Sequence, residues 1–206
     1  MDPPRRARQR ADRRQRLLAA GLASFADLGF AQTTVRNITE RADLGHGTFY
    51  QYFQNKEDLL RTLIAERIAT LASQLRHRAS TDALTQDLQC GILDIFRWFE
   101  EHRGVLLALQ EAIHLNPTVL AAWEPARTCL EGWLASSIEK GEQLGLYRGI
   151  ERERAVAMSL SLLIGVAYEA ILSRRYDPGV GLRQLADDAA TFCANALFRL
   201  PDSQAG

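Results

Sequence analysis

The chain has 206 residues, of which 47% are hydrophobic and 24% are charged. This composition is typical of a globular protein and excludes disordered and collagen-like classes. The formal net charge is zero, yet residues 1–56 hold ten basic and five acidic side chains, whereas the remainder holds fifteen and twenty. A basic first quarter before an acidic body is typical of a protein that brings only its N-terminal part to a polyanion.

The cysteines and the N-terminus bear on the compartment. Cys90, Cys129 and Cys193 lie far apart among apolar residues, which favours buried thiols in a reducing compartment over a disulfide set or a metal site. The N-terminus is rich in arginine and lacks the apolar core of a signal peptide. We also expect no apolar run near the roughly 20 residues that span a bilayer. The sequence therefore predicts a cytoplasmic protein with no membrane partner, no metal and no cofactor.

In chain order, residues 1–12 are predicted to form a flexible basic arm, because they include Pro3-Pro4 and four arginines. Such an arm can lie along phosphates or enter a minor groove. The alternative is a solvated tail that binds nothing. A helix is predicted over residues 13–28, and Gly29 ends it as a C-cap glycine does.

The stretch from residue 33 to residue 58 indicates two short helices and the start of a long one. Thr33 or Thr34 can cap the first helix. Residues 43–45 form the turn, because Asp tolerates a left-handed backbone and Gly adopts it at little steric cost. Asn55 with an acid three residues later resembles a capping box. Two short helices joined in this way make a helix-turn-helix, whose second helix suits the DNA major groove.

Residues 33–42, TTVRNITERA, and residues 45–60, GHGTFYQYFQNKEDLL, resemble the DNA-binding signature of the TetR (tetracycline-repressor-like) family of bacterial regulators. Residues 20–30, AGLASFADLGF, are similar to that family's first helix and the turn after it. The resemblance implies an all-α fold of about nine helices. The implied fold comprises a three-helix DNA-binding domain over residues 13–56 and a ligand-binding and dimerisation domain over residues 57–206. It also implies a dimeric repressor that binds a palindromic operator in double-stranded DNA.

The candidate DNA contacts lie in and around the second short helix, because reading a sequence needs groups close to base edges. Base contacts are expected from Gly45, His46, Gly47 and Thr48. Phosphate contacts are expected from seven residues, with the first two foremost: Tyr50, Lys56, Thr33, Thr34, Arg36, Gln51 and Tyr52.

The chain departs from the family pattern at three positions of this stretch. Family members often have Gly, a small hydroxyl residue and Lys where this chain has Asp43, Gly45 and His46, which leaves the operator sequence open. The negative charge of Asp43 should weaken DNA contact slightly unless Arg36 or Arg41 neutralises it.

The body is predicted to be helical over residues 55–78, 82–102, 104–115, 116–145, 151–175 and 182–200, with a break at Pro125 because proline removes a backbone donor. The segment 151–175 is apolar nearly all round in its middle, which indicates burial on every side, and the last segment adds further apolar residues. We expect them to form a homodimer interface through about 151–175 and 182–200, since a half-site reader gains from two-fold symmetry. The alternative is a buried core helix of a monomer.

Aromatic side chains of the body suggest a pocket for a small apolar effector, although each could equally be core. The candidates are Phe96, Phe99, Leu106, Gln110, Ile113, Trp123, Trp133, Met158 and Tyr168. Two alternatives are a helical small-molecule-binding protein or an activator with altered DNA recognition. A third, a helical metalloenzyme, fits poorly, because the single Glu111-x-x-His114 is half of a di-iron motif pair. We expect no enzyme and no catalytic residue.

Overall fold

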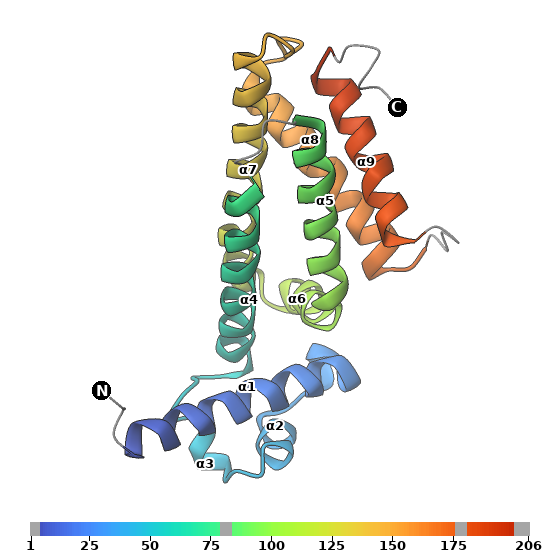
Figure 1. The fold of residues 1–206 in the computed structure, drawn as a ribbon. Coiled ribbons are helices and arrows are strands. Elements are labelled where there is room, and N and C mark those ends of the chain that lie inside the picture. The colour runs from blue at the N-terminus through green and yellow to red at the C-terminus, as the bar shows by residue number, and fades with distance from the viewer. Residues whose placement is uncertain (1–4, 79–83, 176–180, 200–206) are drawn as a thin grey trace. The chain divides into compact units, whose positions relative to one another are not determined.

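The computed structural model describes residues 5–78, 84–175 and 181–199. The predicted all-α class is confirmed: these residues form nine α-helices and no β-sheet, apart from an isolated bridge between Tyr147 and Phe198 (Figure 1). A 3₁₀ turn (η1) and a π-helical segment (η2) complete the helical structure. The elements are α1 (Arg5–Gln32), α2 (Val35–Arg41), α3 (His46–Phe49), α4 (Lys56–Arg78), α5 (Leu84–Glu101), α6 (Arg103–Leu115), η1 (Pro117–Ala122), α7 (Glu124–Gln143), α8 (Arg152–Val166), η2 (Ala167–Leu172) and α9 (Leu182–Leu197).

The helices form two compact units. The first unit joins the described residues up to Arg67 with residues 104–124, and the second joins residues 68–103 with the described residues from Pro125 onward. The first unit therefore holds α1–α3, the beginning of α4, nearly all of α6 and η1. The predicted DNA-binding segment, residues 13–56, lies wholly inside this unit, but the unit is larger because a segment from much later in the chain belongs to it.

Helix α1 begins well before its predicted start. It is helical from Arg5, so the flexible arm expected over residues 1–12 is wrong for residues 5–12. Arginine, alanine and glutamine are good helix formers, and seven of the first eight residues of α1 are of these types. Residues 1–4 of the predicted arm lie outside the described residues. At the other end, Gly29 (φ 76°, ψ 169°) leaves the helical conformation, as predicted.

Helix α2 is set by a reciprocal cap. The Thr34 hydroxyl accepts from the Asn37 amide (3.2 Å), and the Asn37 side-chain oxygen accepts from the Thr34 amide (2.9 Å). Each contact satisfies an amide that the helix start leaves without a partner. The cap is therefore Thr34, one of the two residues that the sequence allowed.

The turn into α3 uses the left-handed conformation at one residue. Asp43 takes φ 50°, whereas Gly45 is extended (φ −65°, ψ 144°). Helix α3 itself has four residues, and turns continue it to Phe53. Phe49 and Phe53 are buried against each other, with ring centroids 5.6 Å apart. Burying each such ring contributes about 1.5–3 kcal/mol, so α3 is held by its aromatic side rather than by its length.

The second unit is built around α5, which packs against α9 and η2. Close to Trp123 the chain breaks between η1 and α7, and Pro125 falls in the first turn of α7, where its missing amide costs little. The predicted break is thereby confirmed. Gly91 of α5 lies directly under the indole of Trp133 on α7, which lets the two helices approach closely.

The apolar helix predicted over residues 151–175 is only partly covered in the single chain. Met158 on α8 is 68% exposed and Phe192 on α9 is 64% exposed. By length and composition alone, residues 152–172 could cross a membrane, and 39% of the most apolar window is buried. This finding corrects the expectation that no apolar run approaches that length. The same exposed surface is what a subunit interface needs.

We predict that Gly91→Ala destabilises the protein, because the added Cβ would overlap the indole of Trp133. Overpacking of this kind costs about 1–3 kcal/mol. The matched control is Gly132→Ala on α7, where nothing lies within 4 Å of the new Cβ. This control should gain about 0.5–1 kcal/mol from helix propensity. Urea unfolding measures both, and equal midpoints for the two variants would show that the close approach is absent.

Candidate nucleic-acid interface

The start of α3 presents the predicted base-contact residues to solvent. Gly45, His46 and Gly47 are exposed and Thr48 is half-buried. A Cβ at Gly47 would meet nothing within 4 Å, so this side of α3 is open. The structure therefore brings the four predicted residues together on one accessible surface, opposite the side on which Phe49 is buried.

The residues that follow α3 extend this surface. Tyr50 is 54% exposed, and its ring lies edge-on against that of His46, with centroids 5.4 Å apart. Gln51 is exposed and Tyr52 is half-buried. The hydroxyl groups of tyrosines and the amide of glutamine are common donors to phosphate oxygens. Tyr50 keeps its predicted role as a candidate phosphate contact, and Gln51 and Tyr52 remain candidates beside it.

Helix α2 contributes two exposed candidates, Thr34 and Arg36. Thr34 is exposed at the N-terminus of α2, although its hydroxyl also takes part in the cap. Arg36 is exposed and forms an ion pair with Glu40 (2.7 Å), which raises the pKa of Arg36. Such an exposed pair contributes little to stability, so Arg36 remains available to a phosphate.

Thr33 is a correction to the predicted contacts. It is 1% exposed, and its hydroxyl donates to the carbonyl oxygens of Gly29 (2.6 Å) and Ser24 (3.1 Å). These carbonyls belong to the C-terminal part of α1. Thr33 therefore closes the end of α1 and cannot reach a phosphate.

Lys56 is the second correction. Its ammonium donates to three carbonyl oxygens, those of Phe30 (2.7 Å), Thr33 (2.9 Å) and Ala31 (3.2 Å). It also lies 4.5 Å from the centroid of the Phe30 ring, within cation–π distance. Burial lowers the pKa of Lys56, and the charges of Glu57 and Glu111 partly offset this. An ammonium has three donors, so all of them serve the backbone between α1 and α2.

Glu111 of α6 binds the same backbone stretch, but through an amide group rather than through carbonyl groups. Its carboxylate accepts from the Phe30 amide at 2.6 Å and lies 3.0 Å from the position that a Cβ on Gly29 would take. The sequence marked Glu111 as half of a metal motif, better interpreted as one of a polar pair in the core or the pocket. Among the described residues, no group of three or more His, Cys, Asp and Glu side chains could hold a metal ion. Glu111 is instead an acceptor for the backbone of the DNA-binding unit.

Asp43 is neutralised, but by a different arginine from those expected. Arg16 of α1 donates to the carbonyl oxygens of Ala42 (2.6 Å) and Asp43 (3.0 Å) and lies 3.4 Å from the Asp43 carboxylate. Arg41 pairs with Asp27 instead (2.6 Å). Arg16 thus ties α1 to the turn between α2 and α3. Arg16 lies one helical turn before the buried Ala20. This position near the buried side of α1 was the one sequence signal for its role.

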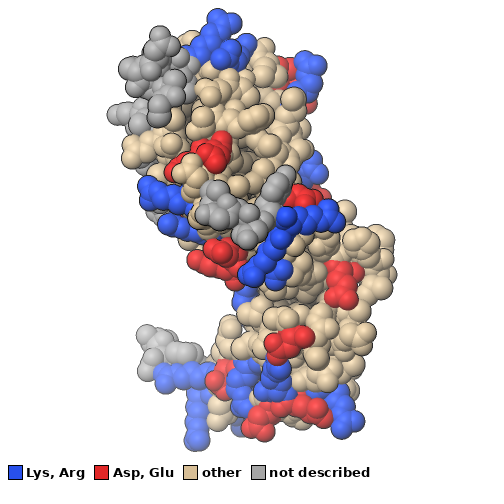
Figure 2. All heavy atoms as spheres, turned by 90° about the vertical axis from the view of Figure 1, so that its right-hand side faces the viewer, with Lys and Arg blue, Asp and Glu red and all other residues tan. Residues whose placement is uncertain are grey.

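Charge on the first unit is mixed rather than uniformly positive. Figure 2 shows Lys and Arg side chains gathered over the helices of this unit, with Asp and Glu side chains among them. Two acids of the first unit, Asp27 and Glu40, are partners of arginines described above. The arginines that remain without such partners therefore decide where a polyanion is attracted most strongly.

The segment that carries this geometry also matches a known family. Residues 17–63 match the family model described as bacterial regulatory proteins, tetR family. The chain belongs to the TetR family. It is a DNA-binding transcriptional regulator, in agreement with the helix-turn-helix predicted over residues 33–58.

Individual TetR-family proteins are similar over different lengths. The HTH-type transcriptional regulator YhgD of Bacillus subtilis is 23% identical over 77% of this chain and 84% of its own. The HTH-type transcriptional repressor KstR2 of Mycolicibacterium smegmatis is 31% identical over 58% of this chain and 52% of its own. The fatty acid degradation regulator FadR from Bacillus halodurans has a similar fold, with a TM-score of 0.75 at 18% identity, covering 94% of this chain and 96% of its own.

The residues predicted to bind the TetR-family effector are divided between the two units. Leu106, Gln110, Ile113 and Trp123 belong to the first unit. The remaining five belong to the second, where Phe96, Phe99 and Trp133 are buried, Tyr168 is half-buried and Met158 is exposed. As a set they remain a prediction.

A mostly apolar cavity of about 520 Å³ lies within the second unit, between α4 and α7. Trp133 is the one predicted residue that lines it. Thr128 and Ser136 supply hydroxyl groups and Cys129 supplies a thiol. The remaining lining residues are apolar or glycine: Ala72, Leu75, Pro125 and Gly132.

We predict that Lys56→Met lowers the free energy of unfolding by about 1–2 kcal/mol, because three carbonyls lose a charged donor. One lost phosphate contact would lower the slope of log affinity against log salt by roughly 0.9, and we expect the same change to lower this slope by much less. Chemical unfolding and binding titrations at several salt concentrations measure the two effects. Gln54→Met, an exposed position nearby, is the control. Unchanged stability with a slope reduced by about one would return Lys56 to the phosphate contacts.

Proposed function

We propose that the protein is a homodimeric repressor that binds a palindromic operator and is released by a small, largely apolar molecule. The observation that carries the proposal is the exposed start of α3, where Gly45, His46 and Gly47 face solvent while Phe49 anchors the helix from behind. Repression rather than activation is supported by the relative KstR2, which is a transcriptional repressor. A bacterial regulator of this kind acts in the cytoplasm, where the DNA is.

The proposed dimer uses the exposed sides of α8 and α9. On α8, the small residues Ala157, Ser161 and Gly165 recur every four positions and are exposed beside Met158. On α9, Phe192 is exposed in the middle of the helix. Small residues let two helices approach closely, and large apolar side chains beside them give up water on association. A two-fold axis here would give the operator two half-site readers.

The proposed effector site is the cavity between α4 and α7. It is mostly apolar, and its few polar groups, on Thr128, Cys129 and Ser136, suit a ligand with one polar end. Ala72 and Leu75 of its lining belong to α4, the helix that begins at Lys56 beside the α1–α2 turn. A ligand that shifts α4 would therefore shift the residue that holds this turn. A relative that regulates fatty acid degradation makes straight-chain fatty acids the first molecules to try.

A mobility-shift titration on DNA from upstream of its own gene tests the proposed function. We expect specific binding that His46→Ala weakens at the operator more than on unrelated DNA, because a base contact carries sequence preference. Addition of straight-chain fatty acids of increasing length should release the wild-type complex. Equal affinity for upstream and unrelated DNA would contradict the proposed function, whereas specific binding without release would contradict only the effector class.

For the dimer, we predict that Phe192→Asp raises the dissociation constant about a hundredfold, because it places a charge in an apolar interface. Sedimentation equilibrium measures this directly. The control is Leu120→Asp on η1, a large exposed apolar side chain outside α8 and α9. If both variants remain as dimeric as the wild type, α8 and α9 do not form the interface.

A further inference from the structure

The N-terminal extension of α1 carries arginines on the side of the helix that is buried further on. Residues 24, 20 and 17 are buried and follow one another at helical spacing along α1. The same spacing, continued toward the N-terminus, gives Arg13, Arg10 and Arg6. The buried side of α1 therefore continues, beyond the end of the apolar core, as a row of three guanidinium groups.

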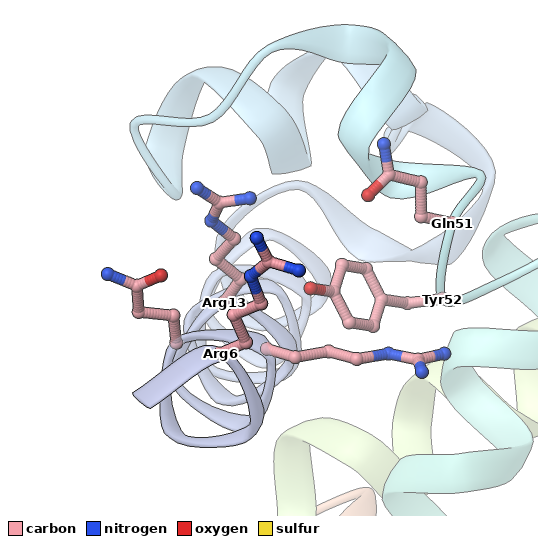
Figure 3. Close-up of a pocket in the computed structure, with 6 residues that line it drawn as sticks. Arg6, Arg13, Gln51 and Tyr52 are labelled. Atoms are coloured by element: carbon pink, nitrogen blue, oxygen red, sulfur yellow. The ribbon is translucent and has the colours of Figure 1, made fainter. Parts of the chain in front are cut away.

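This row forms one wall of a cleft of about 310 Å³, and Gln51 and Tyr52 form the other. Figure 3 shows Arg6 extending from α1 to the hydroxyl end of Tyr52, with Arg13 rising from the same helix beside it. The guanidinium carbon of Arg10 lies 6.0 Å from the centroid of the Tyr52 ring. Arg6, Arg10 and Arg13 are exposed, and so is Gln9, which lines the same wall.

The charges of this cleft are not balanced by carboxylates of the first unit that the structure describes. Arg14 is paired with Glu66 (2.8 Å) and Arg16 with Asp43 (3.4 Å). By contrast, no carboxylate of the described residues pairs with Arg6, Arg10 or Arg13. Three like charges around one small volume repel each other, and an anion placed between them removes that repulsion. Guanidinium groups suit phosphate in particular, because their donors match its oxygens in pairs.

We propose that this cleft binds backbone phosphates of the DNA duplex beside the groove that α3 enters; the inference rests on the proposed function. Gln51 and Tyr52 follow α3 directly in the chain, so a duplex at His46 passes close to the cleft. Arg6 and Arg13 are separated by about 10 Å along the helix axis. Phosphates of one strand recur every 3.4 Å along a duplex, so the row is long enough to contact more than one of them.

The test compares Arg10→Gln and the triple variant Arg6→Gln, Arg10→Gln, Arg13→Gln with the control Arg5→Gln. Arg5 is exposed on the same helix but does not line the cleft. Binding to upstream DNA is measured by fluorescence anisotropy across a series of chloride concentrations. We expect the slope of log affinity against log salt to fall by about 0.9 for Arg10→Gln and by about two to three for the triple variant. The control slope should stay within about 0.3 of the wild type.

A second series replaces part of the chloride by inorganic phosphate at constant ionic strength. Wild-type DNA affinity that is equal in both salts supports a site for duplex phosphates. If instead phosphate lowers the DNA affinity of the wild type but not that of the triple variant, the cleft binds the free anion and the inference is overturned. Circular dichroism confirms that the variants fold. Slopes equal to the wild type for the triple variant would also overturn it. If the wild type binds no upstream DNA, the proposed function fails instead.

Discussion

Two charged side chains of opposite sign meet at the turn between α1 and α2. Gly29 leaves the helical conformation there, and a backbone group that is buried without a partner at such a kink is costly. Lys56 donates to the carbonyls of this turn, and Glu111 accepts the Phe30 amide. Because the two charges lie near the same few atoms, the charge of Glu111 partly offsets the cost of burying the Lys56 ammonium. The position of α2, and with it that of α3, depends on this turn.

Features with a local cause could be predicted from the sequence. The Thr34 cap, the glycine that ends α1, the break before Pro125 and the apolar stripe of α4 each follow from a few neighbouring residues. A left-handed residue in the turn could also be predicted, because Asp tolerates that conformation, and Asp43 adopts it. Caps, breaks and periodicity act over a turn or two of helix, which is why a single sequence reveals them.

Partners that lie far along the chain could not be predicted. Lys56 and its carbonyls are separated by 23 to 26 residues, and Glu111 and Phe30 by 81. A charged side chain near a helix start fits a phosphate or a buried carbonyl equally well in sequence, and only packing decides between them. The same ambiguity affects the effector pocket, because aromatic residues of a cavity wall and of a filled core have the same sequence pattern.

The position of Glu111 has a consequence for dividing the molecule. A fragment that ends within α4 keeps all three helices of the helix-turn-helix but loses the acceptor of the Phe30 amide, and also Gly104, against which Ala26 packs. The compact unit that contains the helix-turn-helix is thus discontinuous in sequence. A chimera that transplants this specificity onto another regulator must carry residues 104–124 together with the N-terminal helices.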